Sequence, residues 1–321
     1  MPIIFNSLNK IYKMSQMFNP VQDAQNIKKA MEKPKCPLTI IDIVTHRSNA
    51  QRQKIVEEYY KQYQKNITDD FRSSFSGNFQ DSLVALFYTP LDYDCNQIYS
   101  AMKGLGTNED SLIEIFATRS NERINQIKQR YFQLFNQKDL VKEINDETSG
   151  FFRKILLELL NANRSTNTIP DNNECGDCAK RLYNSQFDKK DTLQEAYLDI
   201  FTKKSREELA NISRQYYSWY NKTLLEEIDR LFSSDPRRIF KAIIYSLLSP
   251  SEYFAYRLNK AMKGISTKDV ILIRVIISRE EIDIERIKRY YNQNYGKTLY
   301  EAVKKATSGE YQKLLLELIG I

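Results

Sequence analysis

The segment from Ala101 to Asp110 contains the residue types and spacing best suited to binding chemistry. It reads Ala-Met-Lys-Gly-Leu-Gly-Thr-Asn-Glu-Asp, so Gly104 and Gly106 lie two residues apart. Glycine adopts backbone angles that other residues avoid, which lets a loop turn its carbonyl oxygens inward. Calcium is a hard cation that takes about six to eight oxygen ligands, including backbone carbonyls. Gly104 and Gly106 therefore suit a calcium-binding loop.

The same segment also fits a structural role at the start of a helix. Thr107 and Asp110 have the spacing of a capping box, in which side chains accept hydrogen bonds from first-turn amides. A cap of this kind leaves the loop carbonyls free. The sequence is therefore compatible with a helix cap, a calcium loop, or both.

The cysteines give no second candidate for metal or redox chemistry. Cys175 and Cys178 are the one pair with motif spacing, and the single histidine, His46, is too far away to complete the roughly four ligands of a zinc site. A redox pair would prefer to follow a strand, whereas a polar linker precedes this one. We expect reduced thiols. An EF-hand alignment starting at Asp171 also fails, because Leu182 stands where a bidentate glutamate is needed.

Catalytic chemistry has little support in this sequence. One histidine leaves little from which to build a histidine-based triad, and we expect His46 to cap or pack a helix. Neither a P-loop nor a dinucleotide-binding glycine pattern occurs. Carboxylate catalysis stays open, because 41 acidic residues always offer pairs, but nothing favours it. We expect a protein that is not an enzyme.

Composition and charge limit the kinds of partner that we expect. The formal charge of +7 favours anionic surfaces such as lipid headgroups, nucleic acid or acidic proteins. Tyrosines beside basic residues, as in Arg289–Tyr291, could stack on bases, but Tyr291 falls at a core position of a helix, and we expect no nucleic-acid partner. No apolar run approaches the roughly 18 residues of a membrane span, so we expect a cytoplasmic protein.

An internal repeat organises the elements that carry these residues. Ala101–Gly104 recurs as Ala261–Gly264, 160 residues later, which suggests a unit of about 80 residues. Thr148–Gly150 likewise recurs as Thr307–Gly309. Apolar residues between and after these motifs follow helical spacing in both copies. They are Ile124, Ile127, Tyr131 and Phe135 in one copy and Ile284, Ile287, Tyr291 and Tyr295 in the other.

Two weaker copies fill the rest of the chain. His46–Asn49 parallels Thr118–Asn121, and Ser205–Glu208 marks the same point in a third unit. Ser48 with Gln51, and Ser205 with Glu208, have capping-box spacing and predict helix starts.

These residues together resemble the annexin family. The resemblance covers about residues 20–321; it is strong in repeats two and four, moderate in repeat one and weak in repeat three. It implies an all-α fold of four repeats of about five helices each, arranged as a slightly curved disc whose convex face binds calcium and membrane. The expected divisions are a tail (1–20), repeat one with a degenerate calcium loop (21–90), repeat two with an intact loop (91–161), a linker (162–174), repeat three, degenerate (175–248), and repeat four, partly degenerate (249–321).

The resemblance also implies a ligand set in repeat two. The carbonyls of Met102, Gly104 and Gly106 and the bidentate carboxylate of Glu147 would hold calcium, and Thr107 and Glu109 match a weaker accessory site. With one carboxylate the site stays net positive and completes its coordination with water, which a lipid phosphate can displace. The resemblance thus implies calcium-dependent binding to anionic phospholipid, with a dissociation constant for calcium alone of about 10⁻⁴ to 10⁻³ M.

The other repeats depart from this ligand set. In repeat four, Met262, Gly264 and Ser266 could still supply weak carbonyl ligands, but Ala306 stands in place of Glu147. Repeat one has no glycine in its loop and Ser74 at the acidic position. Repeat three has Ser233–Pro236 near that position. We expect both of these sites to be lost.

Basic residues lie in or beside the loops assigned to the membrane side. We hypothesise that they contact anionic headgroups without calcium, although Lys and Arg, 48 of 321 residues, populate any solvated loop. The candidates are Lys33, Lys35, Lys103, Lys189, Lys190, Arg237, Arg238, Lys263, Lys304 and Lys305.

Protein partners form the remaining hypotheses. Ile4, Leu8, Ile11 and Phe18 would share one face of a tail helix that docks on a partner, or the tail folds back on its own core. The divergent alpha-giardin branch of the family suggests an alternative role as a cytoskeletal scaffold. Self-assembly on membranes is a further expectation, since one calcium site is a weak anchor.

Overall fold

The computed structural model describes residues 18–32, 37–104, 106–264 and 266–320. Lys33 and Lys35, and the expected docking face of the tail up to residue 17, lie outside the described residues. Phe18 is described, and its ring packs against the guanidinium of Arg47 at 5.7 Å from the ring centre.

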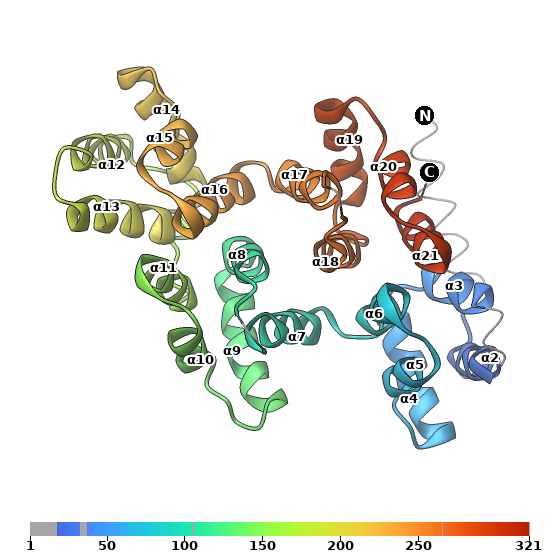
Figure 1. Cartoon of the computed structure of the whole chain (residues 1–321). Coiled ribbons are helices and arrows are strands. Elements are labelled where there is room, and N and C mark those ends of the chain that lie inside the picture. Colours follow the sequence, from blue (N-terminus) through green and yellow to red (C-terminus); the bar gives the residue numbers. More distant parts are fainter. Residues whose placement is uncertain (1–17, 33–36, 105, 265, 321) are drawn as a thin grey trace. The chain divides into compact units, whose positions relative to one another are not determined.

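All regular elements in the described ranges are helices, which confirms the predicted all-α class. They follow one another as four groups of five (Figure 1). The first group is α2 (Pro20–Glu32), α3 (Leu38–Thr45), α4 (Asn49–Tyr63), α5 (Ile67–Ser74) and α6 (Gly77–Leu86). The second is α7 (Pro90–Met102), α8 (Glu109–Thr118), α9 (Asn121–Leu134), α10 (Leu140–Glu147) and α11 (Gly150–Leu160). The third is α12 (Asn172–Ser185), α13 (Lys190–Lys203), α14 (Arg206–Tyr220), α15 (Leu224–Leu231) and α16 (Ser234–Leu248). The fourth is α17 (Pro250–Met262), α18 (Asp269–Arg279), α19 (Ile284–Tyr295), α20 (Leu299–Ala306) and α21 (Gly309–Ile319).

These helices pack into two compact units, one of residues 1–93 with 254–321 and the other of residues 94–253. In the first unit, α21 packs against α3 and α6, so the two ends of the sequence share a core. In the second, α8 packs against α16, α11 against α13, and α12 against α14. Apolar residues at helical spacing are almost fully buried in each unit. Examples are Ile27, Leu83, Leu272 and Leu314 in the first and Ile115, Ile127, Leu156 and Phe240 in the second.

The serine caps predicted from the sequence are present. Ser48 and Gln51 form a reciprocal capping box at the start of α4, and Ser205 and Glu208 form another at the start of α14. His46 is the C-cap of α3, so the expectation that it caps or packs a helix is confirmed.

The arginine beside the capping serine has a structural role of its own. Arg47 donates through Nε to Asp23 at 2.7 Å, and Arg119 pairs with Asp94 at 2.7 Å in the equivalent place. Each bond ties the end of the second helix of a repeat to its first helix. Both aspartates are buried, so removing Arg47 would leave the Asp23 charge uncompensated, whereas Asp94 would keep a weaker partner in Arg123 at 3.5 Å.

Candidate metal centre

The candidate calcium loop joins α7 to α8. Helix α7 ends at Met102, whose side chain is buried, and the following residues, Lys103 and Gly104, are exposed. The amide of Asn108 donates to the carbonyl of Ala101 at 2.7 Å, which closes the intervening residues into a loop.

Two glycines give this loop its shape. Gly104 has a φ of 117° and Gly106 a φ of 86°, both in the region that favours glycine. A Cβ at either position would meet no atom within 4 Å. Glycine is therefore required at both positions because of the backbone angle and not because of a lack of space. A loop that turns its carbonyl oxygens inward needs such backbone angles.

Glu147 is brought to this loop from 40 residues away. It is the last residue of α10, and its carbonyl accepts a hydrogen bond from Thr107 Oγ1 at 2.9 Å. Thr148 Oγ1 donates back to Ile144 O at 2.5 Å, and Arg153 Nε donates to Thr148 O at 2.6 Å, so the end of α10 is held on both sides. The predicted loop and the predicted carboxylate are thus adjacent in space.

The α7–α8 loop and Glu147 together form a corner whose oxygen donors fit a hard cation. The side chain of Glu147 is exposed, and its carboxylate forms no hydrogen bond or ion pair with any described residue. Nowhere in the described ranges do three His, Cys, Asp or Glu side chains gather as metal ligands. A metal here would therefore be held by backbone carbonyls and one carboxylate, a mixture of oxygens that suits calcium and does not suit zinc.

Thr107 does not take the capping role that its spacing to Asp110 allowed. Asn108 caps α8, because its side chain accepts from the amide of Ser111 at 3.2 Å. Helix α8 thus starts one residue later than a Thr107 cap requires, which leaves the Thr107 hydroxyl to bond Glu147. Glu109, the other accessory candidate, is the half-buried first residue of α8.

Repeat four keeps the frame of this corner and lacks its carboxylate. The amide of Lys268 donates to Ala261 O at 2.9 Å, and Thr267 Oγ1 donates to Ala306 O at 2.9 Å. Ala306 therefore occupies the place of Glu147, as the repeat alignment predicted. Gly264 does not share the positive φ of Gly104, and a Cβ on it would lie 3.1 Å from Ser266 O. The carbonyls of Met262, Gly264 and Ser266 are consequently arranged differently from those of repeat two.

The other two repeats also have no carboxylate at this position. Ser74 ends α5, as expected. In repeat three, α15 ends at Leu231, so Leu231 corresponds to Glu147 and the placement of Ser233–Pro236 there is wrong. The alignment of repeat three with the other repeats could not be read from the sequence, because Ser234 stands where repeats one, two and four have glycine. Ser234 has a φ of 50°, and those glycines have φ of 60° to 64°.

The basic candidates differ in their surroundings. Exposed lysines that form no ion pair with a described residue are Lys103, Lys189, Lys190, Lys263, Lys304 and Lys305. Arg238 instead pairs with Asp110 at 2.6 Å and with Asp235. Burial alone would lower the pKa of Arg238, but its bond to Asp110 raises it overall. Arg237 lies 4.0 Å from Asp229.

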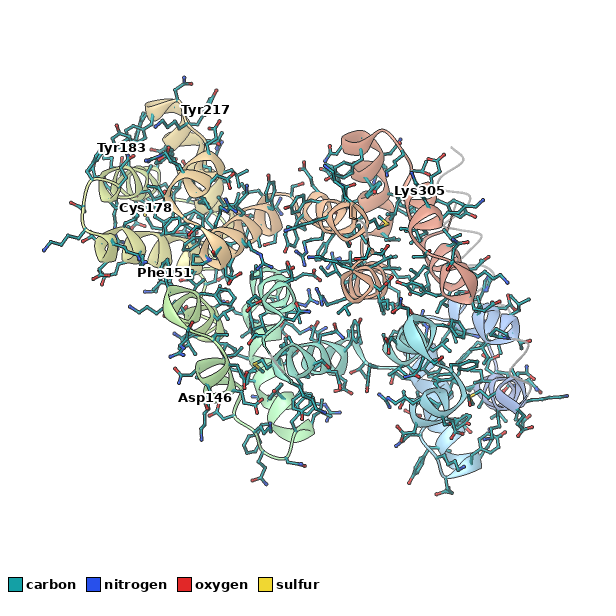
Figure 2. All side chains as sticks on the ribbon, viewed as in Figure 1. Asp146, Phe151, Cys178, Tyr183, Tyr217 and Lys305 are labelled. Atoms are coloured by element: carbon teal, nitrogen blue, oxygen red, sulfur yellow. The ribbon has the colours of Figure 1, made fainter. Side chains whose placement is uncertain are left out.

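One exposed aromatic residue was missed by the sequence reading. Phe187 lies in the loop between α12 and α13 with 72% of its surface exposed, next to Lys189 and Lys190. Its ring contacts Tyr183 of α12, which is labelled in Figure 2, at 5.5 Å between centroids. A large apolar residue inside the polar run 184–190 is the signal that could have identified it.

The cysteines in the described ranges, Cys95, Cys175 and Cys178, are free thiols, as expected. Cys175 is buried and Cys178 half-buried, and burial raises the pKa of both thiols. Asp171, the first position of the rejected EF-hand alignment, caps α12 by accepting from the amides of Asn173 and Glu174. None of the helices in the described ranges combines the length and apolar character that a bilayer crossing requires.

Comparison with known proteins gives a consistent match over most of the chain. The Annexin family model matches residues 22–86, 93–159 and 253–318, so repeat three lies outside the matched segments. Mouse annexin A11 is 37% identical over 304 residues, which are 94% of this chain and 60% of that protein. The chain thus spans about three fifths of the length of this relative.

Solved structures agree with the sequence matches. The annexin III structure is 35% identical and superposes with a TM-score of 0.89 over 95% of this chain and 94% of that one. The calcium-bound structure of annexin (Sm)1 is 31% identical, with a TM-score of 0.81 over 95% and 91% of the two chains. Calcium-bound alpha-14 giardin, at 19% identity and a TM-score of 0.83 over 94% and 100%, shares the fold alone. The family model covers more than half of the chain, and the chain therefore belongs to the annexin family.

Proposed function

We propose that this annexin binds anionic phospholipid membranes in a calcium-dependent manner through the corner formed by the α7–α8 loop and Glu147. The observation that carries the proposal is the hydrogen bond from Thr107 to Glu147 O, because it joins a glycine loop to an unpaired carboxylate. The calcium-bound annexin (Sm)1 structure supports the choice of metal by relationship.

Each residue of the corner has a defined part in this proposal. The carbonyls of Met102, Gly104 and Gly106 and the carboxylate of Glu147 would hold calcium, and Thr107 keeps the two segments together. A bound calcium ion with this donor set would carry excess positive charge and leave coordination positions for lipid phosphate. The loop of repeat four would bind calcium more weakly, because Ala306 offers no carboxylate.

Repeat three would support attachment without calcium. Phe187 exposes an aromatic ring beside Lys189 and Lys190, a combination that suits the interface between headgroups and acyl chains. Each lysine near an anionic surface contributes about 1 kcal/mol, and less at high salt. The exposed Lys304 and Lys305 would act in the same way in repeat four.

The central test is co-sedimentation with phosphatidylglycerol vesicles over a calcium titration. Glu147→Gln should raise the calcium concentration at half-maximal binding at least about tenfold, which corresponds to about 1.4 kcal/mol. Asp146→Asn is the matched control, because Asp146 is exposed on α10 next to Glu147 and carries the same charge (Figure 2). Equal calcium dependence of the two variants would show that the calcium site lies elsewhere.

A further inference from the structure

An aromatic platform stands beside the candidate calcium loop. Tyr99 of α7 and Phe135, just after α9, stack with ring centroids 4.1 Å apart and planes within 8°. Phe135 therefore covers one face of the Tyr99 ring, and Tyr99 as a whole is half-buried.

Two lysines lie over the Tyr99 ring of this platform. Lys103 Nζ lies 5.7 Å from the centre of the Tyr99 ring, and Lys138 Nζ lies 5.3 Å from it. Lys103 belongs to the α7–α8 loop, and Lys138 lies two residues before α10, the helix that ends at Glu147. The attraction of each ammonium to the ring holds the positive charges of Lys103 and Lys138 near the same ring, next to the α7–α8 loop and α10.

The nearby acidic groups compensate these two charges incompletely. Lys138 pairs with Glu143 at 2.6 Å, and this bond raises the pKa of Lys138. Glu143 also accepts a hydrogen bond from the hydroxyl of Tyr131, so its oxygens are already shared. Lys103 has no acidic partner among the described residues. Glu147 contributes a second negative charge near Lys138, but the proposed calcium ion would neutralise it.

Repeat three provides an internal comparison with the same platform and different occupants. Tyr183 and Tyr220 stack at 3.7 Å, and Lys222 pairs with Glu227 at 3.4 Å, as Lys138 does with Glu143. Phe187, four residues after Tyr183, takes the place that Lys103 has relative to Tyr99. The platform thus presents an apolar ring in the repeat without the calcium carboxylate.

Repeat four keeps the lysines and loses the platform. Counting from the Ala-Met-Lys-Gly motif, Lys263 corresponds to Lys103, and Asn259 replaces Tyr99. Among the described residues, two ammoniums on one aromatic ring occur in repeat two, which is also the repeat with the intact loop.

We propose that Lys103 and Lys138 form a second headgroup subsite that binds the phosphate monoester of a lipid such as phosphatidic acid. The inference rests on the proposed membrane binding and specifies the lipid class. A phosphate monoester carries up to two negative charges and three acceptor oxygens, which match two ammoniums, whereas a phosphodiester headgroup carries one charge. The aromatic ring fixes the ammoniums before the lipid arrives, which lowers the entropy cost of binding.

The test compares vesicles of phosphatidylcholine mixed with phosphatidic acid or with phosphatidylglycerol, adjusted to equal surface charge. The wild-type chain should need about tenfold less vesicle for half-maximal binding with phosphatidic acid at one fixed calcium concentration. The double variant Lys103→Gln/Lys138→Gln should lose this preference to within about twofold. Its binding to phosphatidylglycerol vesicles should weaken by no more than about 30-fold, the loss expected for two surface charges of about 1 kcal/mol each, and should keep its dependence on calcium. Lys142→Gln, an exposed lysine on α10, should behave as wild type.

The outcomes separate this subsite from the calcium site. Calcium-dependent binding with no preference for phosphatidic acid, or a preference that survives in the double variant, would overturn the subsite and leave the proposed function intact. Failure of the wild type to bind either vesicle with calcium would overturn both. Glycerol 3-phosphate, titrated into the free chain by calorimetry, tests a soluble source. Binding as tight as that to phosphatidic acid vesicles, lost in the double variant, would overturn the assignment to a lipid.

Discussion

Thr107→Val isolates the contribution of the hydrogen bond that joins the calcium loop to Glu147. The substitution keeps the shape of the side chain and removes the donor to Glu147 O. Helix α8 keeps its start, because Asn108 supplies the cap. The carbonyl of Glu147 lies at the surface, so water can replace the lost donor without a burial penalty.

The expected size follows from the value of one neutral hydrogen bond, about 0.5–1.5 kcal/mol. If that energy holds the loop and Glu147 in the binding arrangement, the calcium midpoint for vesicle binding should rise about two- to twelvefold. Maximal binding at saturating calcium should be unchanged, because Glu147 and the loop carbonyls remain. Co-sedimentation over a calcium titration measures both quantities.

Thr267→Val is the matched control for this prediction. Thr267 makes the same bond, at the same 2.9 Å, to Ala306, where there is no carboxylate. Both variants should lower the melting temperature in chelator by a similar few degrees, but Thr267→Val should leave the calcium midpoint within about 1.5-fold. A midpoint that is unchanged in Thr107→Val, or shifted equally in both variants, would refute the idea that this bond organises a calcium site.

Three further changes probe the other parts of the surface. Ala306→Glu combined with Ser266→Gly should add a second calcium-dependent contact in repeat four and lower the calcium midpoint for vesicle binding about threefold or more. Calorimetry with vesicles measures the number of calcium ions bound per chain. An unchanged number would contradict this prediction. Phe187→Ala should weaken vesicle binding about tenfold or more at every calcium level, because a buried aromatic ring is worth about 1.5–3 kcal/mol; Ile169→Ala, which removes another highly exposed apolar residue, is the control. Burial alone would raise the pKa of Glu208, but the backbone amide of Ser205 lowers it overall. Its stabilisation is therefore present above its ordinary value near 4.5 and is lost as pH falls through the lowered value, so Glu208→Gln should flatten the acid limb of a stability curve measured by urea unfolding.

Much of the fold follows from local patterns that the sequence displays directly. Helical spacing of apolar residues and the capping pairs Ser48–Gln51 and Ser205–Glu208 predicted helices and their starts, because both are set by residues within one or two turns. The match of Thr148–Gly150 with Thr307–Gly309 also placed Ala306 correctly opposite its loop. Where a repeat keeps its glycine, the register can be read from sequence alone.

The site was harder to predict where the sequence allowed one side chain more than one hydrogen-bonding partner. The hydroxyl of Thr107 fits a helix cap by spacing, and only the fold shows that it reaches a carbonyl 40 residues away. In repeat three, Ser234 adopts the left-handed angle without glycine, so no glycine marks the end of α15 at Leu231. The paired lysines on Tyr99 depend on packing between helices that are separated in sequence.

Two bonds within the unit of residues 94–253 connect α15 and α16 to neighbouring segments of repeats two and three. Arg238, near the start of α16, pairs with Asp110 in the first turn of α8 at 2.6 Å, so the α15–α16 connection lies beside the end of the calcium loop. Arg230 of α15 donates to Gln186, which ties the Phe187 loop to the last turn of α15. We hypothesised that Arg238 contacts lipid, but its two acidic partners indicate that it ties the first turn of α16 to the first turn of α8.

Joint engagement of one membrane matters because no single proposed contact is a strong anchor. A calcium site with a dissociation constant of about 10⁻³ M supplies about 4 kcal/mol, a buried aromatic ring about 2 and each surface lysine about 1. Acting together on one membrane, the calcium corner, Phe187 and the pair Lys103 and Lys138 would reach about 8 kcal/mol, which corresponds to micromolar affinity. Acting separately, each would stay near or below the millimolar range. If the proposed contacts engage one membrane at the same time, their energies combine into membrane binding that responds to calcium.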